Sequence, residues 1–170
     1  TIAYNDSNVK IAGHHAGIST GEDGATHQAT EDIATMRVMA NMKVIVPLDY
    51  HEAKKATIAA SKIWGPIYIR LTREKTPLIT TESTKFVPGK SYVLWESKKP
   101  QAVIIGAGPI LYNALLAAKE LEKEKIGSIV LNCHTIKPLD EKKIIELAKK
   151  YRAVVTVEEH TIIGGLGSAV

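Results

Sequence analysis

The densest group of residues that could do chemistry lies between His14 and Gln28, in the segment HHAGISTGEDGATHQ. This segment holds three histidines, two acidic residues and three glycines. Imidazole and carboxylate groups donate, accept and carry protons near neutral pH, as a proton-transfer step requires. The glycines let the backbone turn sharply and approach a ligand closely. The composition therefore indicates a catalytic or binding loop.

Two other interpretations of this segment remain open at the level of residue types. In the first, Asp23, Thr26 and the histidines cap the helix that follows and satisfy backbone groups, as polar loops commonly do. In the second, the histidines bind zinc, although no thiolate accompanies them and the HExxH spacing is absent. Alternation along the chain points His14 away from His15, so we place His14 outside the candidate site.

Two arginines at the end of an apolar run form a second candidate group. Arg70 and Arg73 both carry the planar guanidinium that matches a phosphate better than a lysine does. The structural alternative is an ion pair of either arginine with Glu31 or Glu74, because most surface arginines are used in this way. Residue type alone does not decide between the two.

Polar residues in the second half carry weaker signals. Glu158, Glu159 and His160 follow an apolar run but have no nucleophile beside them, so we expect a structural or interface role. Cys133 stands next to His134 and is expected to be a packed thiol rather than a nucleophile.

The segment GAGPIL at residues 106–111 resembles part of a dinucleotide-binding turn. It lacks the third glycine of GxGxxG, and no acidic residue ends the next apolar run. We therefore interpret its glycines as a tight turn between a strand and a helix.

Apolar runs rich in β-branched residues alternate with helical patterns in both halves of the chain, which is typical of parallel α/β sheets. Strands are expected at 9–12, 43–47, 67–71, 102–105, 128–132 and 154–157, and helices at 30–39, 50–63, 110–124 and 141–151. Asp140 is the expected N-cap of the last helix. Ligands bind at the carboxyl ends of parallel strands, where the histidine-rich segment would lie.

The segment from 74 to 100 contains three prolines and breaks this rhythm, with one short strand expected at 91–95. The sequence thus predicts two consecutive α/β units: one over residues 1–80, a linker over 81–100, and a second, truncated unit over 101–170. Because the chain begins at Thr1, we expect an excerpt of a longer polypeptide.

Composition excludes several classes of protein. The net charge of +4 comes from 22 basic and 18 acidic residues that are mixed along the chain, which is unlike a nucleic-acid surface. No apolar run approaches the ~18 residues of a membrane helix. The single cysteine excludes an internal disulfide and is typical of a reducing compartment, so we expect a cytoplasmic protein.

Specific runs resemble one enzyme family. GISTGEDGATHQ, followed by EDIATMR and then VIVP, is similar to the signature region of transketolases. HTIKPLD, EEH and GGLGS in the second half are similar to the C-terminal domain of that family. The resemblance implies the second part of a pyrimidine-binding domain and most of a C-terminal domain, from a single-chain or a split two-subunit transketolase.

The resemblance also implies roles for individual residues. The histidine that matches His27 lies over the reactive carbon of the cofactor and is catalytic, and the aspartate that matches Asp23 binds a sugar hydroxyl. His15 and the arginine of the pattern TRxxxP, here Arg73, would hold the substrate's phosphate. Arg70 is a second candidate for that contact, although the pattern favours Arg73.

The function implied is transfer of a two-carbon ketol group from a ketose phosphate to an aldose phosphate in the pentose phosphate pathway. The cofactor would be thiamine diphosphate with Mg2+ or Ca2+, held mostly by segments outside this chain, in which we expect no metal ligands. The partners would be an N-terminal diphosphate-binding domain or subunit, in a homodimer or heterotetramer. We expect this segment to be inactive alone; a non-catalytic assembly module is the alternative.

Overall fold

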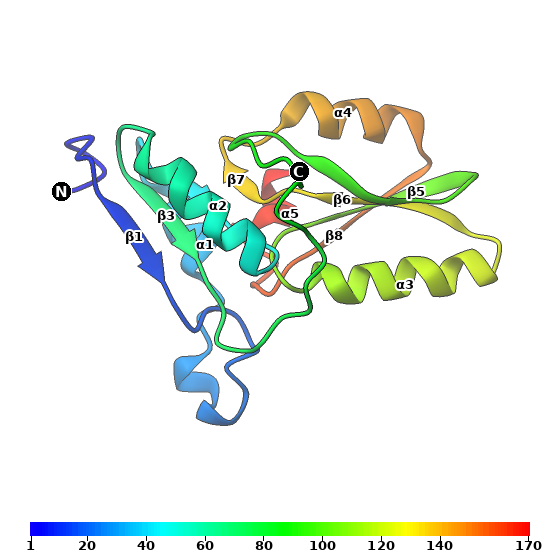
Figure 1. Ribbon diagram of the computed structural model, residues 1–170, viewed down its shortest axis with the longest axis horizontal. Helices are drawn as coiled ribbons and strands as arrows, with labels where there is room; N and C mark the ends of the chain where they lie inside the picture. The colour runs from blue at the N-terminus through cyan, green and yellow to red at the C-terminus, as the bar shows by residue number, and fades with distance from the viewer.

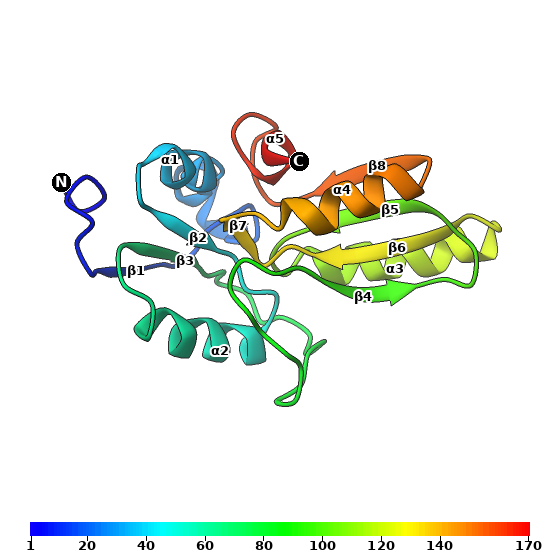
Figure 2. The same ribbon diagram turned by 90° about the horizontal axis from the view of Figure 1, so that it is seen from above.

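The computed structural model describes all residues from Thr1 to Val170 and contains two four-stranded sheets (Figure 1). The first sheet has the order β1-β3-β2-β7. Its strands are β1 (Lys10–Gly13), β2 (Lys43–Ile45), β3 (Ile67–Arg70) and β7 (Thr135–Lys137). Helices α1 (Asp32–Val38) and α2 (Tyr50–Ser61) cover its opposite faces (Figure 2).

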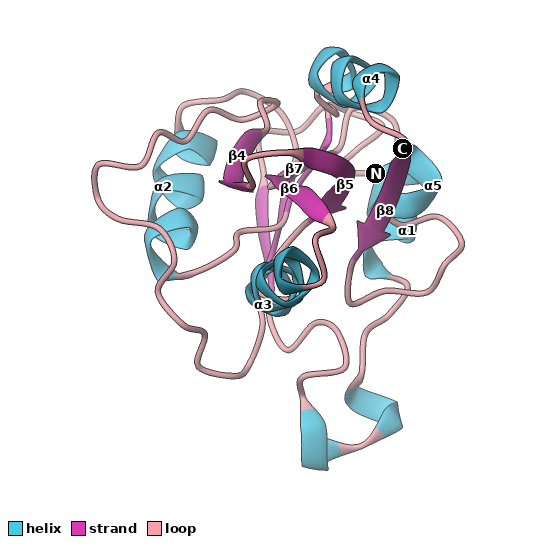
Figure 3. Ribbon diagram, turned by 90° about the vertical axis from the view of Figure 1, so that its right-hand side faces the viewer, coloured by secondary structure: helices cyan, strands magenta, loops and turns pink.

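The second sheet has the order β4-β6-β5-β8. Its strands are β4 (Tyr92–Glu96), β5 (Pro100–Gly106), β6 (Gly127–Asn132) and β8 (Ala153–Val157). Helices α3 (Leu111–Lys123) and α4 (Glu141–Lys150) lie on opposite faces of this sheet, and the short α5 (Leu166–Ala169) follows β8 (Figure 3). Strands β6 and β3 are buried along their whole length, as expected of apolar strands that are covered on both faces of a sheet.

The predicted α/β class is confirmed, and a helix or strand lies at each predicted position. In both sheets the central pairs are parallel: β3 pairs with β1 and β2, and β5 pairs with β6 and β8. The strand β7 and two short 3-10 turns were not predicted. β7 comes from the second half of the chain but pairs antiparallel with β2, so the first sheet is built from both halves.

The interpretation of Asp140 as a side-chain cap of α4 is wrong in one respect. Asp140 occupies the N-cap position, but its side chain makes no capping hydrogen bond. Its Oδ2 instead accepts a hydrogen bond of 2.9 Å from the backbone N–H of Ser91. The carboxylate therefore attaches the segment before β4 to the start of α4.

The largest apolar cluster draws residues from both sheets. It includes Val44 and Tyr68 from the first sheet and Val103, Ile105 and Leu131 from the second. Because these side chains pack as one cluster, neither sheet can shift without opening the interior of the other.

A buried polar network also joins the two sheets. The Glu52 carboxylate in α2 accepts hydrogen bonds from the Leu48 backbone N–H (2.7 Å), from Asn132 Nδ2 (2.8 Å) and from the Tyr92 hydroxyl. Glu52 is 1% exposed. Burial raises the pKa of Glu52, and the three hydrogen bonds oppose that rise only in part.

Two expectations of structural roles are confirmed. Cys133 is fully buried, and burial raises the pKa of its thiol to about 11, so it is a packed thiol. A Cβ on Gly106 would lie 2.6 Å from a methyl group of Leu111, and Gly108 has a φ of 79°. These two glycines form the tight turn from β5 into α3.

No helix of the structure is long and apolar enough to cross a membrane.

The raised pKa of Glu52 predicts how stability depends on pH. When the pH is above the pKa of Glu52 in the folded protein, the buried carboxylate is charged, and this charge lowers the free energy of unfolding. When the pH is below the ordinary pKa of 4.5, the carboxyl is protonated and does not lower the free energy of unfolding. Glu52→Gln removes the charge and keeps an acceptor oxygen for Leu48. We expect the variant to gain stability relative to the native protein as the pH rises from 4.5 to about 7.

Urea unfolding of the variant and the native protein at both pH values measures the difference in their free energies of unfolding. The test depends on how this difference changes with pH and not on its value at low pH. The exposed Glu120, which pairs with Lys123 on the surface of α3, provides the control substitution Glu120→Gln. If the free energy of unfolding of Glu52→Gln relative to the native protein stayed constant or fell with rising pH, the buried-charge explanation would be contradicted.

Candidate active site

The histidine-rich segment forms a loop that leaves the carboxyl end of β1 and projects from the body of the protein (Figure 1). Its base is closed by two backbone hydrogen bonds, from Ala16 N–H to the Leu71 carbonyl (3.1 Å) and from Gly17 N–H to the Ala29 carbonyl (2.8 Å). Two 3-10 turns, η1 (Gly21–Asp23) and η2 (Ala25–His27), form its tip. The tip is largely exposed to solvent.

Gly24 connects these two turns with a φ of 80° and a ψ of −179°. This conformation is accessible essentially only to glycine. A residue with a side chain would strain the junction, so Gly24 determines how Asp23 and His27 stand relative to each other.

The structure brings together two of the four predicted site residues, Asp23 and Arg73. Arg73 Nη1 donates hydrogen bonds to Asp23 Oδ2 and to the Thr20 carbonyl, the latter at 3.0 Å. Arg73 Nη2 lies 3.8 Å from Glu22 Oε1. The side chains of Asp23 and Arg73 are 33% and 32% exposed. An ion pair this open to water contributes little to stability, so it can exchange partners at low cost.

The two predicted histidines are not bonded to this ion pair. His27 ends η2, and its Nδ1 lies 3.0 Å from the Thr26 hydroxyl, while its Nε2 makes no hydrogen bond within the chain. His15 has a left-handed backbone with a φ of 59° and is exposed. No hydrogen bond or ion pair joins either histidine to Asp23 or Arg73.

Arg70 lies inside the protein, and the ion pair expected for it with Glu31 or Glu74 is wrong. Its side chain is 3% exposed, and its Nε lies 2.8 Å from Asp32 Oδ2 rather than near Glu31 or Glu74. Arg70 Nη2 donates to the carbonyls of Ala29 (3.1 Å) and Glu159 (2.8 Å). Its Nε and Nη2 groups are thus bonded inside the protein.

The predicted structural role of the EEH segment is confirmed. The Glu158 carboxylate accepts hydrogen bonds from the backbone N–H groups of Leu166 (2.7 Å) and Gly167 (2.9 Å) in α5. His160 Nε2 accepts one of 3.2 Å from the N–H of Ala34 in the first turn of α1. Burial raises the pKa of the Glu159 carboxyl, and Arg70 and Ser19 oppose that rise.

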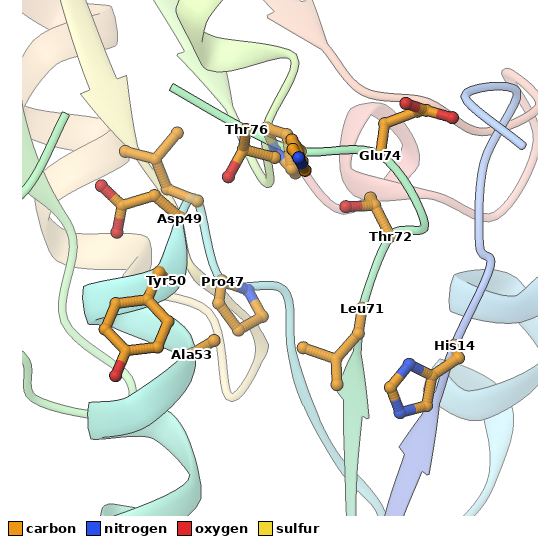
Figure 4. A pocket seen from close by; sticks show the side chains of 12 residues that line it. His14, Pro47, Asp49, Tyr50, Ala53, Leu71, Thr72, Glu74 and Thr76 are labelled. Carbon is orange, nitrogen blue, oxygen red and sulfur yellow. The ribbon is translucent and has the colours of Figure 1, made fainter. Parts of the chain in front are cut away.

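A cavity of about 480 Å³ lies beside the loop at the carboxyl ends of β1, β2 and β3. Figure 4 shows His14 and Leu71 on one side of it and Asp49, Tyr50 and Ala53 on the other. None of the four predicted site residues lines it, whereas His14, which we placed outside the site, does.

Sequence reasoning missed this cavity because its walls come from separate segments. The one local signal was a carboxylate, Asp49, directly after the apolar run of β2. Its side chain serves the fold: it accepts hydrogen bonds from the backbone of Glu52, Ile79 and Thr80 and from the Thr80 hydroxyl. Burial favours a higher pKa for Asp49, but these bonds outweigh it and lower the pKa below 3.8.

The chain contains no group of three or more His, Cys, Asp or Glu side chains that could hold a metal ion.

Two family models match the chain. One, described as the transketolase pyrimidine binding domain, matches residues 1–78, and the other, described as the transketolase C-terminal domain, matches residues 91–170. The chain belongs to the transketolase family. This confirms the resemblance carried by the GEDGATHQ and HTIKPLD runs, and it implies use of thiamine diphosphate.

Individual transketolase relatives agree. A Methanocaldococcus jannaschii protein, named as a transketolase C-terminal section, is 43% identical over 99% of this chain and 52% of its own length. A 6-deoxy-6-sulfo-D-fructose transketolase subunit of Clostridium sp. is 40% identical over 99% of this chain and 52% of its own length. A solved split-gene transketolase, an inactive β4 tetramer, is 44% identical with a TM-score of 0.90, covering 99% of this chain and 54% of that one. The chain therefore spans about half the length of these relatives.

The buried Arg70–Asp32 pair generates a prediction about stability. Asp32→Ala would leave a guanidinium that is 3% exposed without its ion-pair partner. Removing one partner of a buried ion pair costs about 3–5 kcal/mol, so we expect a loss near that size in the free energy of unfolding. Urea titration of the two proteins measures it.

The matched control is Glu31→Ala, since Glu31 is the preceding acidic residue but is exposed, and its side chain bonds only to Thr30. We expect a much smaller loss for this variant. If Asp32→Ala cost no more than Glu31→Ala, Arg70 would not depend on Asp32 as the geometry indicates.

Proposed function

We propose that this chain forms the pyrimidine-domain and C-terminal part of an active transketolase, which transfers a two-carbon ketol group from a ketose phosphate to an aldose phosphate. The observation that carries the proposal is the exposed loop of the family signature, on which the Asp23–Arg73 pair stands at the same tip as His27. We assign residues 1–80 to the pyrimidine-binding domain, 81–100 to a linker and 101–170 to the C-terminal domain. The pathway served would be the pentose phosphate pathway in the cytoplasm.

The donor set of this chain fits a supporting role around thiamine diphosphate rather than a cradle for it. The cofactor, when bound, supplies the electron sink that lets a carbon–carbon bond beside a carbonyl break and form. His27 suits contact with its reactive part, because Nδ1 is occupied by Thr26 and Nε2 is unbonded. The diphosphate and its Mg2+ or Ca2+ need ligands that this chain does not group together. We assign those to a partner segment.

Each residue of the loop then has one task. His27 Nε2 holds or returns a proton at the sugar oxygen where negative charge develops. Asp23 accepts a hydrogen bond from a sugar hydroxyl. Arg73 uses one nitrogen, Nη1, on Asp23 and Thr20, so its remaining donors are available for the phosphate, together with His15.

Activity would require a partner: an N-terminal diphosphate-binding domain or subunit, in a homodimer or a heterotetramer. The similar split-gene structure is an inactive tetramer of β chains, which supports the view that this part alone does not catalyse transfer. The exposed loop tip fits such an arrangement, because its polar side chains have few partners within the chain.

A second candidate substrate is a sulfonated sugar, because one relative acts as a sulfofructose transketolase subunit. A sulfonate is also a tetrahedral anionic group that an arginine fork can bind, although it carries less charge than a phosphate. Comparing phosphorylated and sulfonated donors in one assay separates the two candidates.

The first test is ketol transfer by the chain assembled with its N-terminal partner, in the presence of thiamine diphosphate, Mg2+, xylulose 5-phosphate and ribose 5-phosphate. We expect sedoheptulose 7-phosphate to form, and His27→Ala to lower kcat by about 100-fold or more, the scale of a lost acid–base group. His51→Ala, on α2, is the control and should leave the rate unchanged. Native activity that does not need His27 would refute its catalytic role; no transfer at all would favour the non-catalytic module.

The phosphate role of Arg73 is tested by a comparison of acceptors. Arg73→Ala should reduce kcat/KM for phosphorylated acceptors by about 10- to 100-fold, the value of a charge-assisted hydrogen bond, and much less for unphosphorylated ones. The exposed Arg152, far along the chain in the segment before β8, provides the control Arg152→Ala. Equal losses for both kinds of acceptor would count against this role.

A further inference from the structure

Glu159 reaches from the second half of the chain to the base of the loop. It follows β8, and its Oε2 accepts a hydrogen bond of 3.4 Å from the Ser19 hydroxyl. A Cβ on Gly17 would lie 2.8 Å from Glu159 Oε2 and 3.0 Å from Glu159 Cβ. The carboxylate thus packs directly on residues 17–19, at a place where only glycine leaves room for it.

The backbone of Glu159 is itself held in place. Its carbonyl accepts the 2.8 Å hydrogen bond from Arg70 Nη2, and the same nitrogen donates to the carbonyl of Ala29. Ala29 lies at the far end of the loop and also accepts from Gly17 N–H. One buried cation therefore fixes both the end of the loop and the residue that contacts its beginning.

The loop has few other attachments. Its backbone bonds at Ala16 and Gly17 fix only the base. Beyond Gly17, Arg73 bonds to Thr20 and Asp23, and Gln28 Nε2 donates to the Ile18 carbonyl at 3.4 Å, the same distance as the bond from Ser19 to Glu159. Arg73 is the residue that must also serve substrate, so it is a poor permanent anchor.

We propose that Glu159 is a positioning residue: its carboxylate fixes residues 17–19 and thereby determines where Asp23 and His27 stand at the tip. Glu159 acts through the loop and does not itself touch the reacting atoms. The inference rests on the proposed function for its kinetic consequence, whereas its structural part concerns this chain alone. It assigns to the second half of the chain a direct part in shaping a site carried by the first half.

The test uses the chain assembled with its N-terminal partner and three variants. Glu159→Ala removes the contact, Glu159→Gln keeps an acceptor oxygen of the same reach, and Glu158→Ala is the matched control, because that carboxylate bonds to α5 and not to the loop. Hydrogen–deuterium exchange of the amides in residues 17–28 reports the position of the loop, and kcat and KM report its effect on transfer.

We expect Glu159→Ala to speed exchange across residues 17–28 and to lower kcat by about 10-fold or more, as a displaced catalytic group does. Glu159→Gln should restore most of both. Glu158→Ala should speed exchange only near α5. Unchanged loop exchange in Glu159→Ala, or equal losses in the Ala and Gln variants, would overturn the proposal.

The two proposals fail separately. If the native assembly shows no ketol transfer, the proposed function is wrong, and the exchange comparison still decides whether Glu159 fixes the loop. If the native assembly is active but Glu159→Ala retains native kcat and KM, the positioning role is wrong and the function stands.

Discussion

The guanidinium of Arg70 is the charge around which the region of the site is organised. A cation that is 3% exposed must be paired, because an unpaired charge at this depth costs several kcal/mol. Asp32 supplies a counter-charge, and the carbonyls of Ala29 and Glu159 accept hydrogen bonds from Arg70 Nη2. These three partners lie in α1, in the loop and after β8. Satisfying one buried cation therefore fixes three segments against the end of β3.

This arrangement requires the two sheets to keep a fixed position relative to each other, since Glu159 follows the last strand of the second sheet and Arg70 ends a strand of the first. Three features provide that relation. β7 pairs with β2, the largest apolar cluster contains residues of both sheets, and Glu52 bonds to Tyr92 and Asn132 across the junction. The loop is thus positioned by packing far from its own sequence, while its tip remains open to solvent.

Local sequence patterns were sufficient to predict the strands and helices that depend mainly on neighbouring residues. Strand and helix periods predicted the fold class and the place of the longer elements, and the GEDGATHQ run identified the loop. β7 was not predicted because three residues carry no period, and its pairing with β2 joins positions about ninety residues apart in register. Likewise, Asp140 was correctly placed before α4, but its partner Ser91 lies in a distant segment.

The two arginines show the same limit most clearly. Arg70 and Arg73 stand three positions apart, and nothing in their immediate neighbours tells which one is buried. The difference arises from Asp32 and the carbonyl of Glu159, which meet Arg70 only when the chain is folded. The cavity beside His14 was missed for a related reason, since strand ends and Pro109 from separate segments form its walls.

The different environments of the two arginines also suit different tasks. Breaking the Arg70 pair would leave a buried charge without its partner, so Arg70 is suited to a permanent contact with the end of the loop. The Arg73–Asp23 pair is about one-third exposed on each side, and water already weakens it, so a ligand can replace either partner at little cost. Under the proposed function, a loop with a fixed base and an exchangeable ion pair at its tip would admit an anionic sugar without losing the alignment of His27. Burial, rather than residue type, distinguishes the two arginines.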